Sequence, residues 1–310
     1  MIASTTAVVV AQTQQVIYAD GRRATVEDAR KGSGDRWTVS LDGRRVVLRP
    51  GEVVAIVIGT EETVLIPSLG EAPPSPETTA MLASVADPKN QDFRTSLAQV
   101  VTPPTRAAFD AFEKLVADKN KKLRERGIEG LAHLRTRESV CAAAAAVLAE
   151  KDSGVRRDAA SALFAAQEVF KRSDTGDLVK SGLEDKERVV RYVFAMLAPA
   201  DDDAAKAILR EQGIKDRDHH VRESAALELG RRGDDAGESI LVGMLGRKKL
   251  PGFGNDRATM ERFLIDEHVA VCAVLGTFES ERARAALSKA AKSEHEAVRK
   301  AAEAALAAKR

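Results

Sequence analysis

The pattern of hydrophobic and polar residues divides the chain into two parts. Between residues 15 and 66, apolar residues alternate with polar ones, as in the stretch that contains Trp37, Val39 and Leu41. A period of two predicts strands with one buried face. Asp-Gly pairs separate such stretches and favour hairpin turns, because both central residues of the turn need positive φ. These pairs are Asp20-Gly21 and Asp42-Gly43. The pattern predicts about five or six short strands.

A set of short strands at this spacing is typical of a small SH3-like β barrel, which we expect over residues 15–66. The run from Tyr18 to Ile56 also resembles small β modules that precede helical repeats in some bacterial proteins. Trp37 could serve as a ligand platform, but a single Trp in so small a barrel more often belongs to its core.

Beyond this part, apolar positions recur with the period of a helix. Residues 67–76 are rich in proline and predict a stiff, extended linker. Further on, Val221, Ala225 and Leu229 lie at positions i, i+4 and i+8, which places them on one face of an amphipathic helix. We predict that residues 77–310 form a helical domain.

The helix that contains Val221 belongs to a repeated pattern. An acidic turn residue is followed by Val-Arg or Leu-Arg and then by an Ala- and Leu-rich run. From Arg94 the signature arginines follow at intervals of 30, 32, 35 and 31 residues, and Arg299 lies 77 residues after Arg222. A shorter amphipathic stretch precedes each signature helix. One such helix pair buries only one side, so the pairs must stack into an array.

This arrangement, with Asp in the turn and Val-Arg opening the second helix, resembles the HEAT repeats of armadillo-like α-solenoids. The resemblance covers residues 77–309 and implies a right-handed α-α superhelix. In HEAT arrays the turn aspartate and the helix arginine bond along the stack. The resemblance therefore implies a structural ladder of Asp118, Arg124, Asp152, Arg156, Asp185, Arg191, Asp216, Arg222 and Arg299. Ala270 stands where an arginine is expected, which marks that repeat as irregular.

Charge and composition narrow the function classes. The 310 residues include 48 Lys or Arg and 47 Asp or Glu, which gives a net charge of +1. No global field would draw such a chain to nucleic acid, so a nucleic-acid partner is not favoured. Aromatic residues make up 4% of the chain, which is few for a surface that stacks bases. Cys141 and Cys272 lie in apolar helical runs and are expected to be buried thiols.

The first residues allow two interpretations. Val9 and Ala11 would stand at the positions that precede a signal-peptidase cleavage site, so residues 1–14 are either a signal remnant or a tail that leads into a strand. The absence of a basic segment argues against a complete signal. The location is open, with export to the periplasm slightly ahead of a cytoplasmic location. No stretch approaches the ~20 apolar residues that a membrane span requires.

An insertion in the irregular repeat is the main candidate for binding. Residues 246–257 are basic and glycine-rich. Repeat insertions project from one face and often carry the binding function. The alternative is a solvated loop that only lengthens one turn. The candidate partner-binding residues are Arg247, Lys248, Lys249, Phe253 and Arg257.

No constellation of catalytic residues is evident in the sequence. HEAT-like metal hydroxylases carry several His-Glu dipeptides on facing helices, whereas only His295-Glu296 has that order here. HEAT-like DNA glycosylases use aromatic and basic groups, and this repeat region has no Trp and mixed charges. We therefore assign no catalytic, cofactor-binding or metal-ligating residue, and we expect no cofactor.

A regular repeat without convergent catalytic groups favours a non-catalytic scaffold or adaptor. We expect it to bind another protein through the concave face of the solenoid. The alternative is a HEAT-like modifying enzyme of the lyase or nucleic-acid glycosylase class. That class would need acidic or histidine side chains that converge in the groove.

Overall fold

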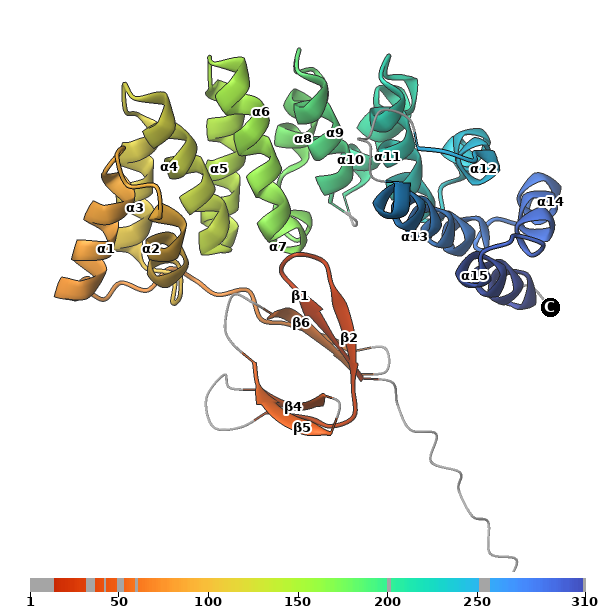
Figure 1. The fold of residues 1–310 in the computed structure, drawn as a ribbon, viewed down its shortest axis with the longest axis horizontal. Helices are drawn as coiled ribbons and strands as arrows, with labels where there is room; N and C mark the ends of the chain where they lie inside the picture. The colour runs from red at the N-terminus through yellow and green to blue at the C-terminus, as the bar shows by residue number, and fades with distance from the viewer. Residues whose placement is uncertain are drawn as a thin grey trace, which may run out of the picture. The chain divides into compact units, whose positions relative to one another are not determined.

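The computed structural model describes residues 14–31, 37–41, 43–48, 53–58, 61–199, 202–250 and 257–308. Helices make up 62% of the described residues, and the described strands lie in the N-terminal part of the chain (Figure 1). The chain divides into two compact units, which we call the N-terminal unit (Met1–Asp174) and the C-terminal unit (Thr175–Arg310). No described helix combines the length and the apolarity that crossing a membrane requires.

Within the described residues, the strands of the N-terminal unit form two antiparallel sheets. The strands are β1 (Gln14–Tyr18), β2 (Arg23–Val26), β3 (Ala29–Lys31), β4 (Trp37–Leu41), β5 (Arg44–Val47), β6 (Val53–Ile58) and β7 (Glu61–Val64). The sheet orders are β2-β1-β6-β7 and β3-β4-β5. Each sheet therefore keeps two edge strands, and the described strands close no barrel. The β region is confirmed, but the SH3-like barrel is not.

Both sheets contribute to one small hydrophobic core. Its buried residues include Val16, Val26, Trp37, Val39 and Ile56. The Trp37 side chain is 8% exposed and belongs to this core, as the alternation of its strand predicts. In the turn between β1 and β2, the glycine of the first Asp-Gly pair has a φ of +84°, a conformation that glycine adopts without steric cost.

Helix pairs make up the rest of the N-terminal unit. The elements are α1 (Pro76–Ala86), α2 (Phe93–Val100), α3 (Arg106–Val116), α4 (Lys121–Leu134), α5 (Arg137–Ala149), α6 (Ser153–Ala162), η1 (Leu163–Ala166) and α7 (Gln167–Lys171). Helices α1 and α2, α3 and α4, and α5 and α6 pack as pairs, and α4 also packs on α6. The second helices α4 and α6 therefore lie side by side (Figure 1).

The C-terminal unit repeats this arrangement. Its elements are α8 (Gly176–Leu183), α9 (Arg188–Leu197), α10 (Asp203–Glu211), η2 (Gly213–Lys215), α11 (His219–Gly230), η3 (Asp235–Gly237), α12 (Glu238–Gly246), α13 (Arg257–Leu275), α14 (Glu281–Ala290) and α15 (Glu296–Ala307). The second helices α9, α11, α13 and α15 pack in that order. The insertion joins α12 to α13, and its residues 251–256 lie outside the described residues.

The hydrophobic period explains how these helices pack. Val221, Ala225 and Leu229 of α11 are fully buried, as their spacing predicts. Small residues determine how closely neighbouring helices approach each other. A Cβ atom on Gly182 of α8 would lie 2.1 Å from the Phe194 ring of α9, so only glycine allows this pair to approach so closely. The observed helix pairs bear out the HEAT-like architecture.

Candidate functional site

The signature arginines bind the turns that precede their own helices. Arg191 donates from Nη1 to the carbonyl oxygens of Asp185 at 2.9 Å and Lys186 at 3.1 Å. The same bond to carbonyls five or six residues upstream is made by Arg124, Arg222 and Arg299, and Arg156 bonds to the carbonyl six residues upstream. Each guanidinium thus satisfies carbonyl oxygens that no helix hydrogen bond can reach.

Some of these arginines also bind the turn of the next repeat. Arg191 donates to both carboxylate oxygens of Asp216, at 2.7 and 3.1 Å, and the two side chains are 5% and 11% exposed. Arg124 makes the same paired contact with Glu150, at 2.7 and 3.0 Å. The bond from Arg124 holds the pKa of Glu150 below its usual value.

The aspartates of the predicted ladder have different contacts. Asp152 accepts hydrogen bonds from Gly154 N and Val155 N and so caps α6. The paired contact from Arg124 that the ladder predicts for Asp152 is made instead with Glu150, two residues earlier. Asp118 and Asp185 each accept a backbone N–H two residues downstream. These carboxylates organise the turns.

Arg247, a predicted partner-binding residue, points into the C-terminal unit. Its side chain is 14% exposed and forms ion pairs with Glu223 of α11 at 2.9 Å and Glu267 of α13 at 3.1 Å. This arginine bridges α11 and α13 in the repeat where Ala270 replaces the signature arginine. Burial raises the pKa of Glu267 to about 7, although Arg247 opposes the shift, and the nearby Glu223 adds to it.

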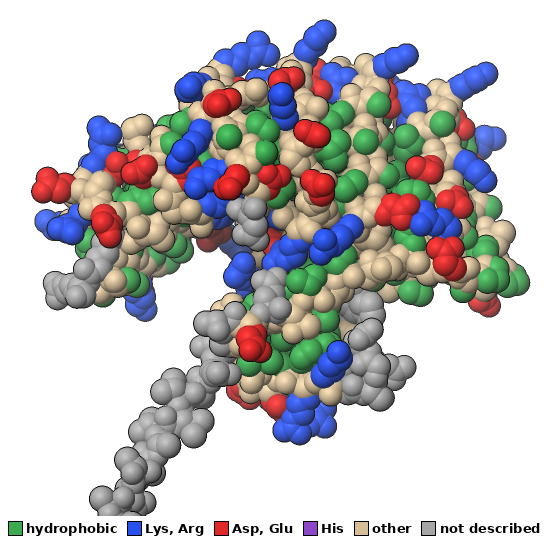
Figure 2. Space-filling view, turned by 180° about the vertical axis from the view of Figure 1, so that it is seen from behind, with side chains coloured by type: hydrophobic (Ala, Val, Ile, Leu, Met, Phe, Trp, Pro, Cys, Tyr) green, Lys and Arg blue, Asp and Glu red, His purple; other side chains and the backbone are tan. Residues whose placement is uncertain are grey.

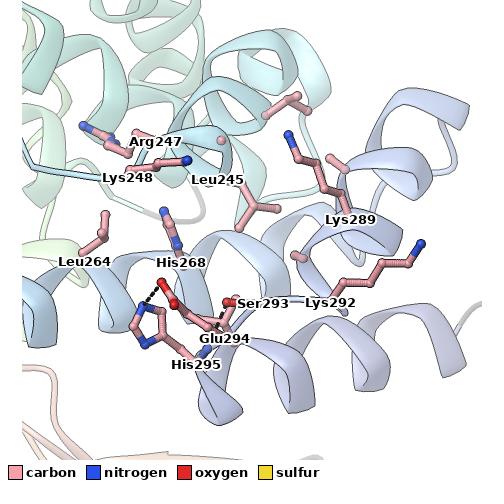
Figure 3. A pocket seen from close by; sticks show the side chains of 15 residues that line it. Leu245, Arg247, Lys248, Leu264, His268, Lys289, Lys292, Ser293, Glu294 and His295 are labelled. Atoms are coloured by element: carbon pink, nitrogen blue, oxygen red, sulfur yellow. Dashed lines mark hydrogen bonds and ion pairs between the residues drawn. The ribbon is translucent and has the colours of Figure 1, made fainter.

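Beside Arg247 lies a pocket of about 610 Å³ between the ends of α12 to α15 (Figure 3). Its apolar lining comes from Val242, Leu245, Leu264, Ala286, Ala290 and Val298. Lys248 follows α12, Lys289 lies in α14 and Lys292 lies in the turn before α15, and all three are exposed. No acidic side chain of the described residues forms an ion pair with these three lysines. The pocket thus offers apolar surface together with three lysines and one carboxylate, that of Glu294.

Two histidines complete the pocket. His268 is 7% exposed, and its Nε2 lies 3.1 Å from the carbonyl oxygen of Met244. Burial lowers the pKa of His268. The ring of His295 lies 3.7 Å from the Glu294 carboxylate (Figure 3). It also lies 3.9 Å from the carboxylate of Glu261. His268 is fixed to the backbone, whereas His295 sits at the rim.

The structure describes only some of the other predicted binding residues. Lys249 is exposed near the end of the described segment. Phe253 lies outside the described residues, and the Arg257 backbone begins α13 while its side chain lies outside the description. The structure therefore brings Arg247 and Lys248 to one pocket.

A cluster of metal-binding side chain types lies at the start of α11. One ligand atom each of His219, His220 and Glu223 lies within 4.8 Å of the others. From the sequence, His219 and His220 were expected to have a structural or solvent role, and Glu223 was not grouped with them. The spacing i, i+1, i+4 was the available signal, since residues four apart share a helix face.

The N-terminal unit has a pocket between α4 and α6 that is acidic, in contrast to the lysine-lined pocket of the C-terminal unit. It encloses about 530 Å³ and is lined by Glu125, Glu129, His133 and Asp158. Burial lowers the pKa of His133 to about 4 and raises that of Glu125, which Asp158 raises further. Figure 2 shows blue and red side chains mixed over the helical repeats, so the charge contrast is local to the pockets.

No protein-family model and no curated protein sequence matches the chain. Solved structures with a similar fold include the archaeal HEAT-like repeats protein from Thermococcus onnurineus, with 13% identity, a TM-score of 0.47, and coverage of 77% of this chain and 98% of that chain. The complex of CpcE and CpcF of phycocyanin lyase from Nostoc shows 16% identity, a TM-score of 0.40, and coverage of 78% and 99%.

Human deoxyhypusine hydroxylase in complex with glycerol is also similar, with 19% identity, a TM-score of 0.29, and coverage of 75% of this chain and 95% of that chain. At such identities the similarity concerns the fold alone. All three TM-scores are below 0.5, so the HEAT-like architecture rests on the helix pairs of the structure itself.

Proposed function

We propose that this protein is a non-catalytic scaffold or adaptor that binds another protein through the concave face of its HEAT-like repeats. The pocket beside Lys248 anchors an acidic segment of that partner which also carries apolar side chains. The observation that carries this proposal is the combination of an apolar lining with Lys248, Lys289 and Lys292, which have no acidic partner among the described residues. A partner carboxylate would supply the missing counter-charge.

The arrangement of the insertion supports the same site. Arg247, the second residue of the insertion, is held by two glutamates, and Lys248 follows it. The base of the insertion is thereby fixed, while Lys249 stays exposed. In this proposal Arg247 positions the segment, and Lys248 and Lys249 contact the partner, with Phe253 and Arg257 further along the insertion.

Charge reversal of the pocket lysines tests the proposal. A variant with Lys248→Glu, Lys289→Glu and Lys292→Glu is used as bait beside the wild type in affinity capture from the native source, followed by titration of the recovered partner. We expect at least about a tenfold loss of affinity, because three attractive contacts become repulsive. The matched control carries Lys180→Glu, Lys186→Glu and Lys215→Glu, which are exposed in the same unit but outside the pocket. Equal affinity for the pocket variant and the control would refute the site.

One observation favours the alternative, a HEAT-like modifying enzyme of the lyase or nucleic-acid glycosylase class. The pKa of Glu267 is about 7, the range in which a carboxyl group can both donate and accept a proton. Turnover of a captured partner that disappears in Glu267→Gln, with binding intact, would support the enzyme over the scaffold.

A further inference from the structure

The first turn of α11 carries a compact set of nitrogen and oxygen donors. The His219 and His220 rings lie with their centroids 3.9 Å apart at an angle of 37°, and Glu223 follows within one helical turn. We propose that His219, His220 and Glu223 bind one divalent transition-metal ion, with zinc as the ion that fits best. This site is separate from the lysine pocket and does not depend on the protein-binding proposal.

The environment of His219 points to a missing ligand. Its Nε2 is buried and has no hydrogen-bond partner among the described residues. A buried polar nitrogen without a partner is costly, because it has lost its water without a replacement. A metal ion shared with His220 and Glu223 would satisfy this nitrogen.

The donor types decide which ion fits. Two imidazole nitrogens and one carboxylate suit zinc and its neighbours in the transition series, whereas calcium and magnesium prefer oxygen donors throughout. In a tetrahedral zinc site the donors lie about 3.4 Å apart, given zinc–ligand distances of about 2.0–2.1 Å. The present donors lie within 4.8 Å of one another, so side-chain rotations can close the site.

A neighbouring group orients one of the proposed ligands. Arg247 Nη2 lies 2.9 Å from one Glu223 oxygen, which leaves the second oxygen of that carboxylate for the metal. Such a contact orients a ligating carboxylate from outside the coordination sphere.

The surrounding charges are largely compensated. Arg188 lies 3.8 Å from the Asp218 carboxylate, and Arg247 is paired with Glu223 and Glu267, so neither cation faces the site alone. Tyr192 of α9 meets the His220 ring edge-on, with centroids 6.4 Å apart. Three protein ligands leave a coordination position for water or a bound group, as in catalytic rather than structural zinc sites.

The test is direct metal binding by the full chain. After dialysis against a chelator, the protein is titrated with Zn²⁺ by calorimetry and with Co²⁺ by visible absorption. We expect about one ion per chain, Co²⁺ bands of a low-symmetry site, and a rise in Tm with Zn²⁺. Affinity should fall at least about tenfold in His219→Ala and in Glu223→Gln.

A histidine outside the site provides the control. His295→Ala removes a ring that also lies near carboxylates, at 3.7 and 3.9 Å, and should leave the Zn²⁺ affinity unchanged. His220→Asn gives a second loss of one donor should His219→Ala fail to fold. The proposal is overturned by an absence of saturable Zn²⁺ binding in the wild type, by unchanged affinity in the site variants, or by an equal loss in His295→Ala.

Discussion

At the scale of single residues, Arg247 is the counter-charge for two glutamates of the C-terminal unit. One guanidinium faces two carboxylates, Glu223 and Glu267, and all three side chains are at most 20% exposed. A single positive charge cannot fully compensate two buried negative charges. Burial, with a smaller contribution from Glu223, raises the pKa of Glu267 to about 7 against the effect of Arg247, so that near neutral pH this carboxyl group is partly protonated.

This shift predicts a specific dependence of stability on pH. The Glu267 pKa is about 7 in the folded chain and 4.5 as the ordinary value, so between these pH values the folded state binds more protons than the unfolded state. The free energy of unfolding should therefore contain a contribution that is complete below pH 4.5 and is lost as pH rises through 7.

Glu267→Gln removes this contribution, because glutamine does not titrate. Urea denaturation at several pH values should show that the variant gains stability relative to the wild type as pH rises from 4.5 to 7. Parallel stability profiles of the two proteins across that range would show that Glu267 titrates normally.

At the scale of elements, the contact between Arg191 and Asp216 joins α9 to the turn before α11. Both side chains are nearly buried, and the arginine also holds two carbonyl oxygens of its own turn. Loss of one partner from such a buried pair leaves an uncompensated charge, which costs far more than the loss of an exposed ion pair.

Asp216→Ala should therefore lower the free energy of unfolding by about 3 kcal/mol. Lys300→Ala serves as the control, since its ion pair with Glu296 leaves the two side chains 73% and 68% exposed and should contribute less than about 1 kcal/mol. Urea denaturation of both variants measures the difference. Equal effects in the two variants would mean that the pair does not join the repeats.

The same elements show what the sequence could predict. Helix periodicity is local, so the burial of Val221, Ala225 and Leu229 followed from their spacing alone. The contact from Arg124 goes to Glu150 and not to Asp152, since Asp152 is occupied as the helix cap. Such a choice depends on turn geometry, which the repeat pattern does not contain.

Contacts between distant segments were harder to predict from the sequence. Strand pairing joins β1 to β6 across the chain, and no local pattern shows whether the edges of two sheets meet. Arg247 was predicted to face a partner because its neighbours are basic and glycine-rich. It faces Glu223 and Glu267 instead, since both carboxylates lie on the two second helices that flank it.

At the scale of the whole molecule, the two units have pockets of opposite charge, although the chain as a whole is nearly neutral. The N-terminal unit holds an acidic pocket and the C-terminal unit a basic one. With a net charge of +1, the protein has no global field, so recognition must depend on these local groups. The β region has its own core, which contains no helical residue.

Because of this separate core, the helical repeats should fold and bind without the β region. The deletion should remove residues 1–68, because Gly70 belongs to the helical part: its N–H donates to Pro104 O at 3.0 Å, and its carbonyl accepts from Arg106 N at 2.9 Å. On the other side, the loss includes two hydrogen bonds from the short helix α7: Glu168 N donates to Ala19 O at 3.1 Å, and Gln167 Nε2 donates to Asp20 O.

We expect the truncated chain to keep its helical circular dichroism, a cooperative thermal transition, and partner affinity within about threefold of the full chain, since the lysine pocket lies wholly in the C-terminal unit. The charge-reversal variant of Lys248, Lys289 and Lys292 in the truncated background provides the control and should still lose binding. A folded truncated chain without affinity would instead assign recognition to the β region, with the repeats as its support.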